Sequence, residues 1–79
     1  MAGTTPTEAL ATTLTKVAES RGISISELSR VTNIPRETLR RKLAGATEFF
    51  MGELFAVSAA LDLDVVEVYG VYADARRAA

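Results

Sequence analysis

Apolar residues recur every three or four positions along most of this 79-residue chain, which is the spacing of helices that bury one face. No stretch shows the strict alternation of apolar and polar residues that is typical of half-buried strands. We therefore expect an all-α domain, folded as a compact bundle of four to five short helices. The expected helices cover about residues 6–20, 25–32, 35–44, 51–61 and 64–70.

Polar residues and glycines mark where these helices begin and end. In a capping box, a side-chain oxygen and a glutamate three residues later satisfy free backbone amides reciprocally. Gly22 and Asn33 suit the left-handed conformation that ends many helices. Phe50 has no acceptor for a cap, so Thr47 is the predicted cap of the fourth helix. The three predicted capping boxes pair Thr5 with Glu8, Ser24 with Glu27, and Asp64 with Glu67.

The same periodicity predicts the hydrophobic core. Each expected helix collects apolar residues on one side, and Phe49 is placed to pack on Leu54 across the start of the fourth helix. The residues expected to face inward are Leu10, Leu14, Val17, Ala18, Leu28, Val31, Leu39, Leu43, Leu54, Val57, Leu61, Val65, Val68, Tyr69 and Tyr72.

The domain organisation follows from the ends of this pattern. Residues 1–5 are expected to be a flexible N-terminus and residues 6–70 the folded domain. Gly70 can end the fifth helix, so residues 71–79 either continue it or form a tail, which would be dimerising or disordered.

The composition excludes several kinds of chemistry. With no cysteine and no histidine, the chain cannot form disulfides, and zinc sites and imidazole catalysis are not expected. No nucleophile with a neighbouring base, glycine-rich phosphate loop or cluster of metal ligands is present, so we expect no enzyme, cofactor, metal or small-molecule ligand. The chain shows neither a signal peptide nor a membrane span, and a cytoplasmic location is expected.

Positive charge is concentrated in one short segment. Between Arg30 and Lys42 there are five basic residues and one acid, Glu37, whereas the remainder holds four basic and nine acidic residues. Like charges one helical turn apart, such as Arg36 and Arg40, repel each other and do not favour folding. The distribution, rather than the net charge of −1, therefore indicates a polyanionic partner.

The basic segment lies within two short predicted helices joined by a tight corner. A small residue, Ser29, is followed four positions later by Asn33, six further on by Leu39, and finally by Gly45. This spacing resembles the helix-turn-helix of the phage Cro/repressor family, and the resemblance extends over about residues 8–70. It implies a lambda repressor-like fold and a small DNA-binding transcriptional regulator, whose helix 35–44 enters the major groove of an operator.

The resemblance also implies roles for individual residues. With Leu39 inward, Arg36, Glu37 and Arg41 occupy the places where family members read base edges. Arginine can bind guanine and glutamate can accept from cytosine, which favours a G·C-containing half-site. Many relatives have glutamine where this chain has Ile25, so one phosphate contact is expected to be weaker. The residues expected at phosphates are Ser24, Thr38, Arg40 and Lys42, together with Arg30, which could equally be solvent-exposed.

Other interpretations remain open at this point. Glu37 and Arg41 could form an exposed ion pair on the free protein. Residues 46–74 contain six acids and no base, so this half could instead bind a basic protein, as an antitoxin or anti-repressor would. A homodimer is expected, at least on DNA, because one helix reads only a few base pairs. The candidate dimer surface consists of Phe50, Val66, Val71 and Tyr72.

Overall fold

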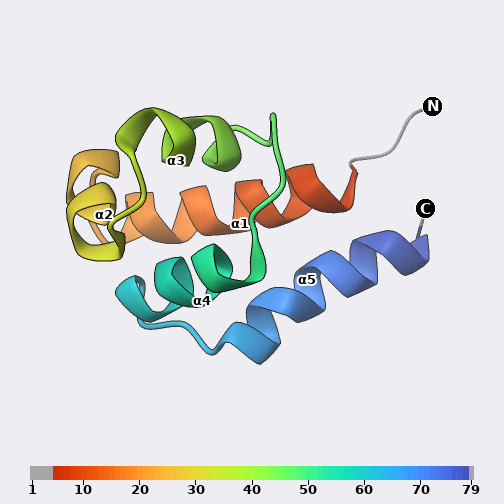
Figure 1. Cartoon of the computed structure of the whole chain (residues 1–79). Helices are drawn as coiled ribbons and strands as arrows, with labels where there is room; N and C mark the ends of the chain where they lie inside the picture. The colour runs from red at the N-terminus through yellow and green to blue at the C-terminus, as the bar shows by residue number, and fades with distance from the viewer. Residues whose placement is uncertain (1–4, 79) are drawn as a thin grey trace.

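The computed structural model describes residues 5–78, and this part of the chain folds into five α-helices without any strand (Figure 1). The all-α prediction is therefore confirmed. The helices are α1 (Pro6–Ser20), α2 (Ile25–Thr32), α3 (Arg36–Leu43), α4 (Met51–Ala60) and α5 (Val65–Ala78). In the described part, no helix is long and apolar enough to cross a membrane.

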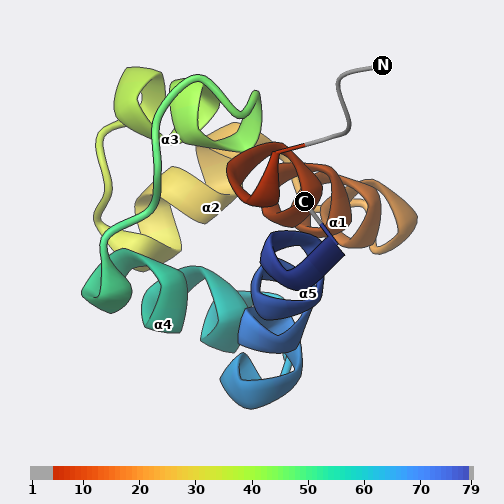
Figure 2. The ribbon, with the colours of Figure 1, turned by 90° about the vertical axis from the view of Figure 1, so that its right-hand side faces the viewer.

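The helices surround one hydrophobic core. Helix α5 packs along α1, while α2 lies at one end of the bundle and contacts both α3 and α4. Viewed at right angles, α3 and α4 lie on opposite sides of the core, and the segment between them runs down the edge of the molecule (Figure 2). Helix α3 thus packs through one side on α1 and α2, and its other side is left uncovered.

Most of the predicted core residues are buried. The side chains of Leu14, Leu39, Val57 and Leu61 are completely inaccessible to solvent, which confirms the inward direction of Leu39. Such residues contribute about 1.5–3 kcal/mol each relative to an exposed position.

Two residues predicted to be inward are largely exposed instead. Val31 is 58% exposed, because the last turn of α2 lies at the end of the bundle and Leu28 alone fills the inward position there. Tyr69 is 49% exposed and stacks on Tyr72 along the surface of α5. Ala11 is buried, although it was not among the predicted core residues.

One of the three predicted capping boxes is complete. Thr5 and Glu8 satisfy each other's backbone amides, as predicted. At the other two predicted boxes, Ser24 accepts the Glu27 amide without a reciprocal bond, and Asp64 accepts from Val66 instead of Glu67. The prediction of Thr47 as the cap of α4 was wrong, since that cap is Phe50 and its amide donates to the Glu53 carboxylate.

The fifth helix does not end at Gly70. Helix α5 continues to Ala78, so residues 71–78 belong to the same helix that packs on α1. Of the two alternatives for the segment after Gly70, a continued helix or a tail, the structure shows the continued helix. The expected end of the folded domain at residue 70 therefore lies inside α5. The last turn of α5 carries two basic residues, Arg76 and Arg77, which suit the negative end of the helix dipole.

The Ser58 hydroxyl is buried in α4 and finds no hydrogen-bond partner within residues 5–78. An unsatisfied buried polar group destabilises the folded state. Replacing Ser58 by alanine should therefore leave the free energy of unfolding unchanged or raise it by about 1 kcal/mol. Ser29→Ala is the matched control, because the Ser29 hydroxyl donates to the Ile34 carbonyl at 2.6 Å and its loss should destabilise by about 1 kcal/mol. Urea unfolding of both variants tests this, and equal losses would contradict it.

Candidate nucleic-acid interface

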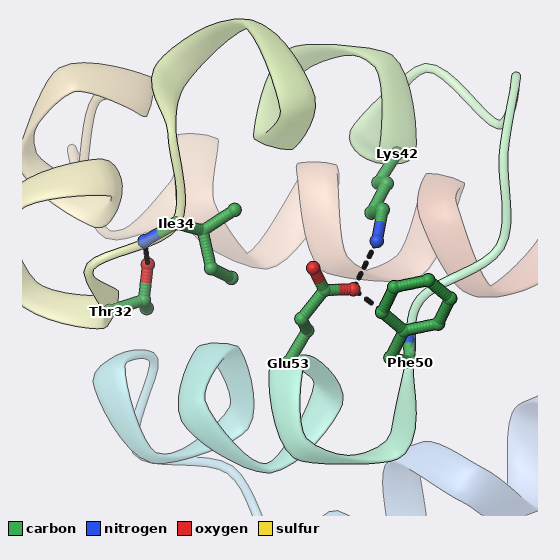
Figure 3. Close-up of polar contacts among 5 residues, drawn as sticks. All are labelled: Thr32, Ile34, Lys42, Phe50 and Glu53. Carbon is green, nitrogen blue, oxygen red and sulfur yellow. Dashed lines mark hydrogen bonds and ion pairs between the residues drawn. The ribbon is translucent and has the colours of Figure 1, made fainter.

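A fixed corner joins α2 to α3. Asn33 adopts the predicted left-handed conformation, with φ of 62°. The Ser29 hydroxyl donates to the carbonyl of Ile34, while the Thr32 hydroxyl accepts the Ile34 amide at 3.3 Å (Figure 3). Because Ile34 itself is buried, these contacts fix the direction in which α3 leaves the corner. Ser29 thus stabilises the corner through a hydrogen bond, and its small side chain also allows the helices to approach closely.

Helix α3 turns one face to the core and the other to solvent. Leu39 and Leu43 are buried, while Arg36, Glu37 and Arg41 are exposed. Pro35 precedes the first turn, where its missing amide hydrogen loses no helical bond. The three residues predicted to read bases therefore project from the uncovered face of the helix.

Glu37, the only acid on α3, pairs with Arg40 and not with Arg41, which was the partner considered from the sequence. Glu37 accepts from Arg40 through both carboxylate oxygens, at 3.0 Å from Nε and 2.5 Å from Nη2. Arg36 and Arg41 make no ion pair within residues 5–78. Arg36 and Arg41 thus remain available to a ligand at the exposed face of α3.

The prediction that Lys42 contacts phosphate is not compatible with its position. Lys42 is only 5% exposed, and its ammonium group forms an ion pair with Glu53 of α4. Figure 3 shows Lys42 reaching from α3 towards α4, beside the ring of Phe50. The ammonium nitrogen lies 4.0 Å from the centre of that ring, which is a cation–π contact. Lys42 follows Leu39 by three residues and so shares its inward side, a signal that was present in the sequence.

One oxygen of Glu53 joins the two helices. It accepts from Lys42 and also from the Phe50 amide, at 2.8 Å from the amide nitrogen. Burial favours the neutral form of Glu53, but the hydrogen bonds from Lys42 and Phe50 and the charge of Lys42 lower its pKa overall. The carboxylate therefore stays ionised and holds the last turn of α3 against the start of α4.

The remaining predicted phosphate contacts lie on the surface or at its edge. Ser24 is exposed and caps α2, Arg30 is exposed on α2, and Thr38 is half-buried. Thr38, Arg41 and Phe50 line the same open groove. Ile25 packs against the core, which explains how this position can be apolar in the present chain.

The candidate dimer residues are in different environments. Phe50 and Val66 are 71% and 73% exposed, whereas Val71 is half-buried. Tyr72 packs partly against the core and donates its hydroxyl to Glu48, so much of it is already in contact within the protein. Two further apolar residues that were not predicted for this surface, Met51 and Phe55, are exposed one turn apart on α4.

The arrangement is that of a helix-turn-helix protein whose second helix carries an exposed basic face. A family model described as the Cro/C1-type HTH DNA-binding domain matches residues 13–74. The chain belongs to this family of DNA-binding domains, as the spacing of Ser29, Asn33, Leu39 and Gly45 indicated. Comparison with curated proteins and with solved structures gave no match.

Proposed function

We propose that the protein is a sequence-specific regulator of transcription that inserts α3 into the major groove of an operator. The observation that carries this proposal is the division of α3 into a buried side at Leu39 and an exposed side at Arg36 and Arg41. Because neither arginine makes an ion pair within residues 5–78, no ion pair of this part of the chain has to break before they bind DNA. The planar guanidinium group can bind O6 and N7 of guanine through two hydrogen bonds.

Other residues would contact the DNA backbone. Arg40 and Arg30 are exposed cations flanking the reading face, and Ser24 lies at the positive end of the α2 dipole. Thr38 lies at the edge of the same face. Lys42 has no part in this proposal, because its charge is already paired with Glu53.

Two copies of the chain would be needed for useful affinity. One recognition helix reads only a few base pairs, so a homodimer on a pseudo-palindrome with half-sites about 34 Å apart is the expected complex. Bound in this way, the protein would act as a repressor by blocking polymerase, as phage or prophage repressors do, and would be associated with the nucleoid. We propose no enzymatic activity for it.

The proposal makes different predictions for two neighbouring arginines. Arg41→Ala should relax specificity at one base pair and weaken binding to the preferred duplex by about 1–3 kcal/mol. Arg40→Ala should weaken binding to all duplexes alike and reduce the slope of log K against log salt by about 0.9. Titrations of labelled duplexes at several salt concentrations measure both effects.

The same titrations distinguish DNA binding from the alternative function, which is binding of a basic protein by the acidic half of the chain. If neither variant differs from the parent chain on any duplex, α3 is not the reading helix. If the parent chain binds no duplex at low salt, the acidic half becomes the better candidate for the working surface. Asp62, Asp64 and Glu67 are all exposed around the start of α5, as a surface for a basic protein partner requires.

A further inference from the structure

The basic surface of α3 contains one carboxylate, and that carboxylate is in contact with a cation. Both oxygens of Glu37 accept hydrogen bonds from Arg40, three residues later on the same helix. Both side chains remain open to solvent, with exposed fractions of 57% for Arg40 and 69% for Glu37. A ligand approaching the uncovered face of α3 would therefore meet the pair, rather than either side chain alone.

Glu37 stays ionised in this surrounding. Its pKa is lowered by the hydrogen bond from Arg40, and the charges of Arg40, Arg41 and Arg36 act in the same direction. The pKa of Arg40 is raised by the same hydrogen bond and by the charge of Glu37. Both groups are thus charged at neutral pH.

The pair does little for the stability of the fold. Exposed ion pairs contribute little to stability, because water solvates both charges and the side chains lose conformational freedom. What the pair does determine is the orientation of the Arg40 guanidinium group, since two parallel hydrogen bonds fix a planar group in a way that one bond does not. Arg36 and Arg41, which make no ion pair within residues 5–78, are not oriented in this way.

The geometry of the guanidinium group determines which N–H donors of Arg40 remain available to a ligand. Arginine has five N–H donors, arranged as two forks that share Nη2. Glu37 occupies the fork formed by Nε and Nη2, so the fork formed by Nη1 and the second hydrogen of Nη2 is free. That outer fork matches two oxygens of a phosphate group.

The position of Arg40 favours the DNA backbone over a base. Arg40 borders a groove together with Ser24 and Ile25 at the start of α2, on the flank of α3. Arg41 borders a different groove, with Thr38 and Phe50. The two arginines therefore border different grooves, and the groove of Arg40 is shared with the start of α2.

We propose that Glu37 is a positioning residue, which holds Arg40 so that its outer fork binds one DNA phosphate, and that Glu37 itself contacts no base. This inference rests on the proposed function. It replaces the expectation that Glu37 accepts from cytosine, because Arg40 holds both carboxylate oxygens in a bidentate contact that a cytosine amino group would have to share. Arg40 then fixes the register of α3 on the backbone, and Arg36 and Arg41 read the sequence.

A double-mutant cycle tests the proposal on the duplex that the parent chain prefers. Arg40→Lys keeps the charge but removes the fork, so it should weaken binding about five- to tenfold when Glu37 is present. In the Glu37→Ala background the guanidinium group is no longer held, and Arg40→Lys should change binding by about twofold or less. Glu37→Ala alone should leave the preference at every base pair unchanged.

Glu27→Ala is the matched control, because Glu27 is an exposed acid of the same motif and forms no ion pair within residues 5–78. It removes the same charge, and Arg40→Lys should keep its full effect in that background. Equal effects of Arg40→Lys with and without Glu37 would overturn the proposal. So would loss of preference at one base pair in Glu37→Ala, which would make Glu37 a base reader. Failure of the parent chain to bind any duplex would instead contradict the proposed function.

Discussion

Replacing Glu53 by alanine should destabilise the domain by about 3–5 kcal/mol, because it leaves the Lys42 ammonium group buried without a counter-charge. The side chain of Lys42 is 6% exposed, so water cannot take the place of the lost carboxylate. The Phe50 amide loses its acceptor in the same variant. Since domains of this size are stabilised by about 5–15 kcal/mol, a large part of the total would be lost. Chemical unfolding of the purified variant measures the change.

A second replacement distinguishes a buried charge from a general loss of packing. Lys42→Met removes the charge and keeps a side chain of similar length, so adding it to Glu53→Ala should restore most of the lost stability. If Glu53→Ala instead costs less than about 1 kcal/mol, the pair behaves as an exposed one and the structural account of Lys42 is wrong.

The same pair predicts a dependence on pH. The pKa of Glu53 is lower in the folded protein than in the unfolded chain, so its contribution is complete above the unfolded value. That contribution is lost as the pH falls through the folded value. The difference in unfolding free energy between the parent chain and Glu53→Ala should therefore be constant near neutral pH and shrink in acid. A difference that grows in acid would contradict the sign of the shift.

Leu39→Ala should destabilise the domain by about 2–5 kcal/mol and weaken DNA binding at temperatures where the variant begins to unfold. The side chain is completely buried, so its removal combines lost transfer free energy with a cavity beneath α3. Thermal and chemical unfolding give the stability change.

Val31→Ala is the control for Leu39→Ala, because the sequence pattern assigned both residues to the core while the structure buries only Leu39. A substitution at the exposed Val31 should change the free energy of unfolding by about 0.5 kcal/mol or less. If the two variants lose similar amounts of stability, the orientation of α2 or α3 described above is incorrect.

The sequence was sufficient for the helices and for the corner of the motif. Helix periodicity, capping residues and Asn33 are local features, and local features decide where short helices begin, end and turn. The direction of Leu39 followed from the same periodicity and from the resemblance to the Cro/repressor family. For α1 to α4 these parts agree with the structure to within one or two residues at the helix ends, whereas α5 runs past Gly70 to Ala78.

The sequence did not predict the burial of a side chain where that burial depends on a helix elsewhere in the chain. Lys42 is three residues from Leu39, but its burial depends on α4 bringing Glu53 and Phe50 to it across the core. Val31 shows the opposite case, since its place in the helical pattern is inward while nothing covers the end of the bundle. Periodicity gives the angle of a side chain about its helix axis, and tertiary packing decides what lies at that angle.

The ion-pair partner of Glu37 also could not be predicted from the sequence. Spacing of three and of four residues both place arginines within reach of it, and Arg40 and Arg41 satisfy these two spacings. The structure places the bidentate contact at Arg40, which leaves Arg41 free. This difference leaves Arg41 as an expected base reader and Arg40 as an expected phosphate contact, and it changes the role proposed for Glu37.

Selection of bound sites from a random pool of DNA duplexes shows whether the exposed face of α3 reads sequence in the major groove. We expect enrichment of an inverted repeat with G·C-containing half-sites spaced about 34 Å apart, and loss of that enrichment when Arg36 and Arg41 are both replaced by alanine. Recovery of no common sequence, or of the same sequence by the double variant, would contradict this role of α3.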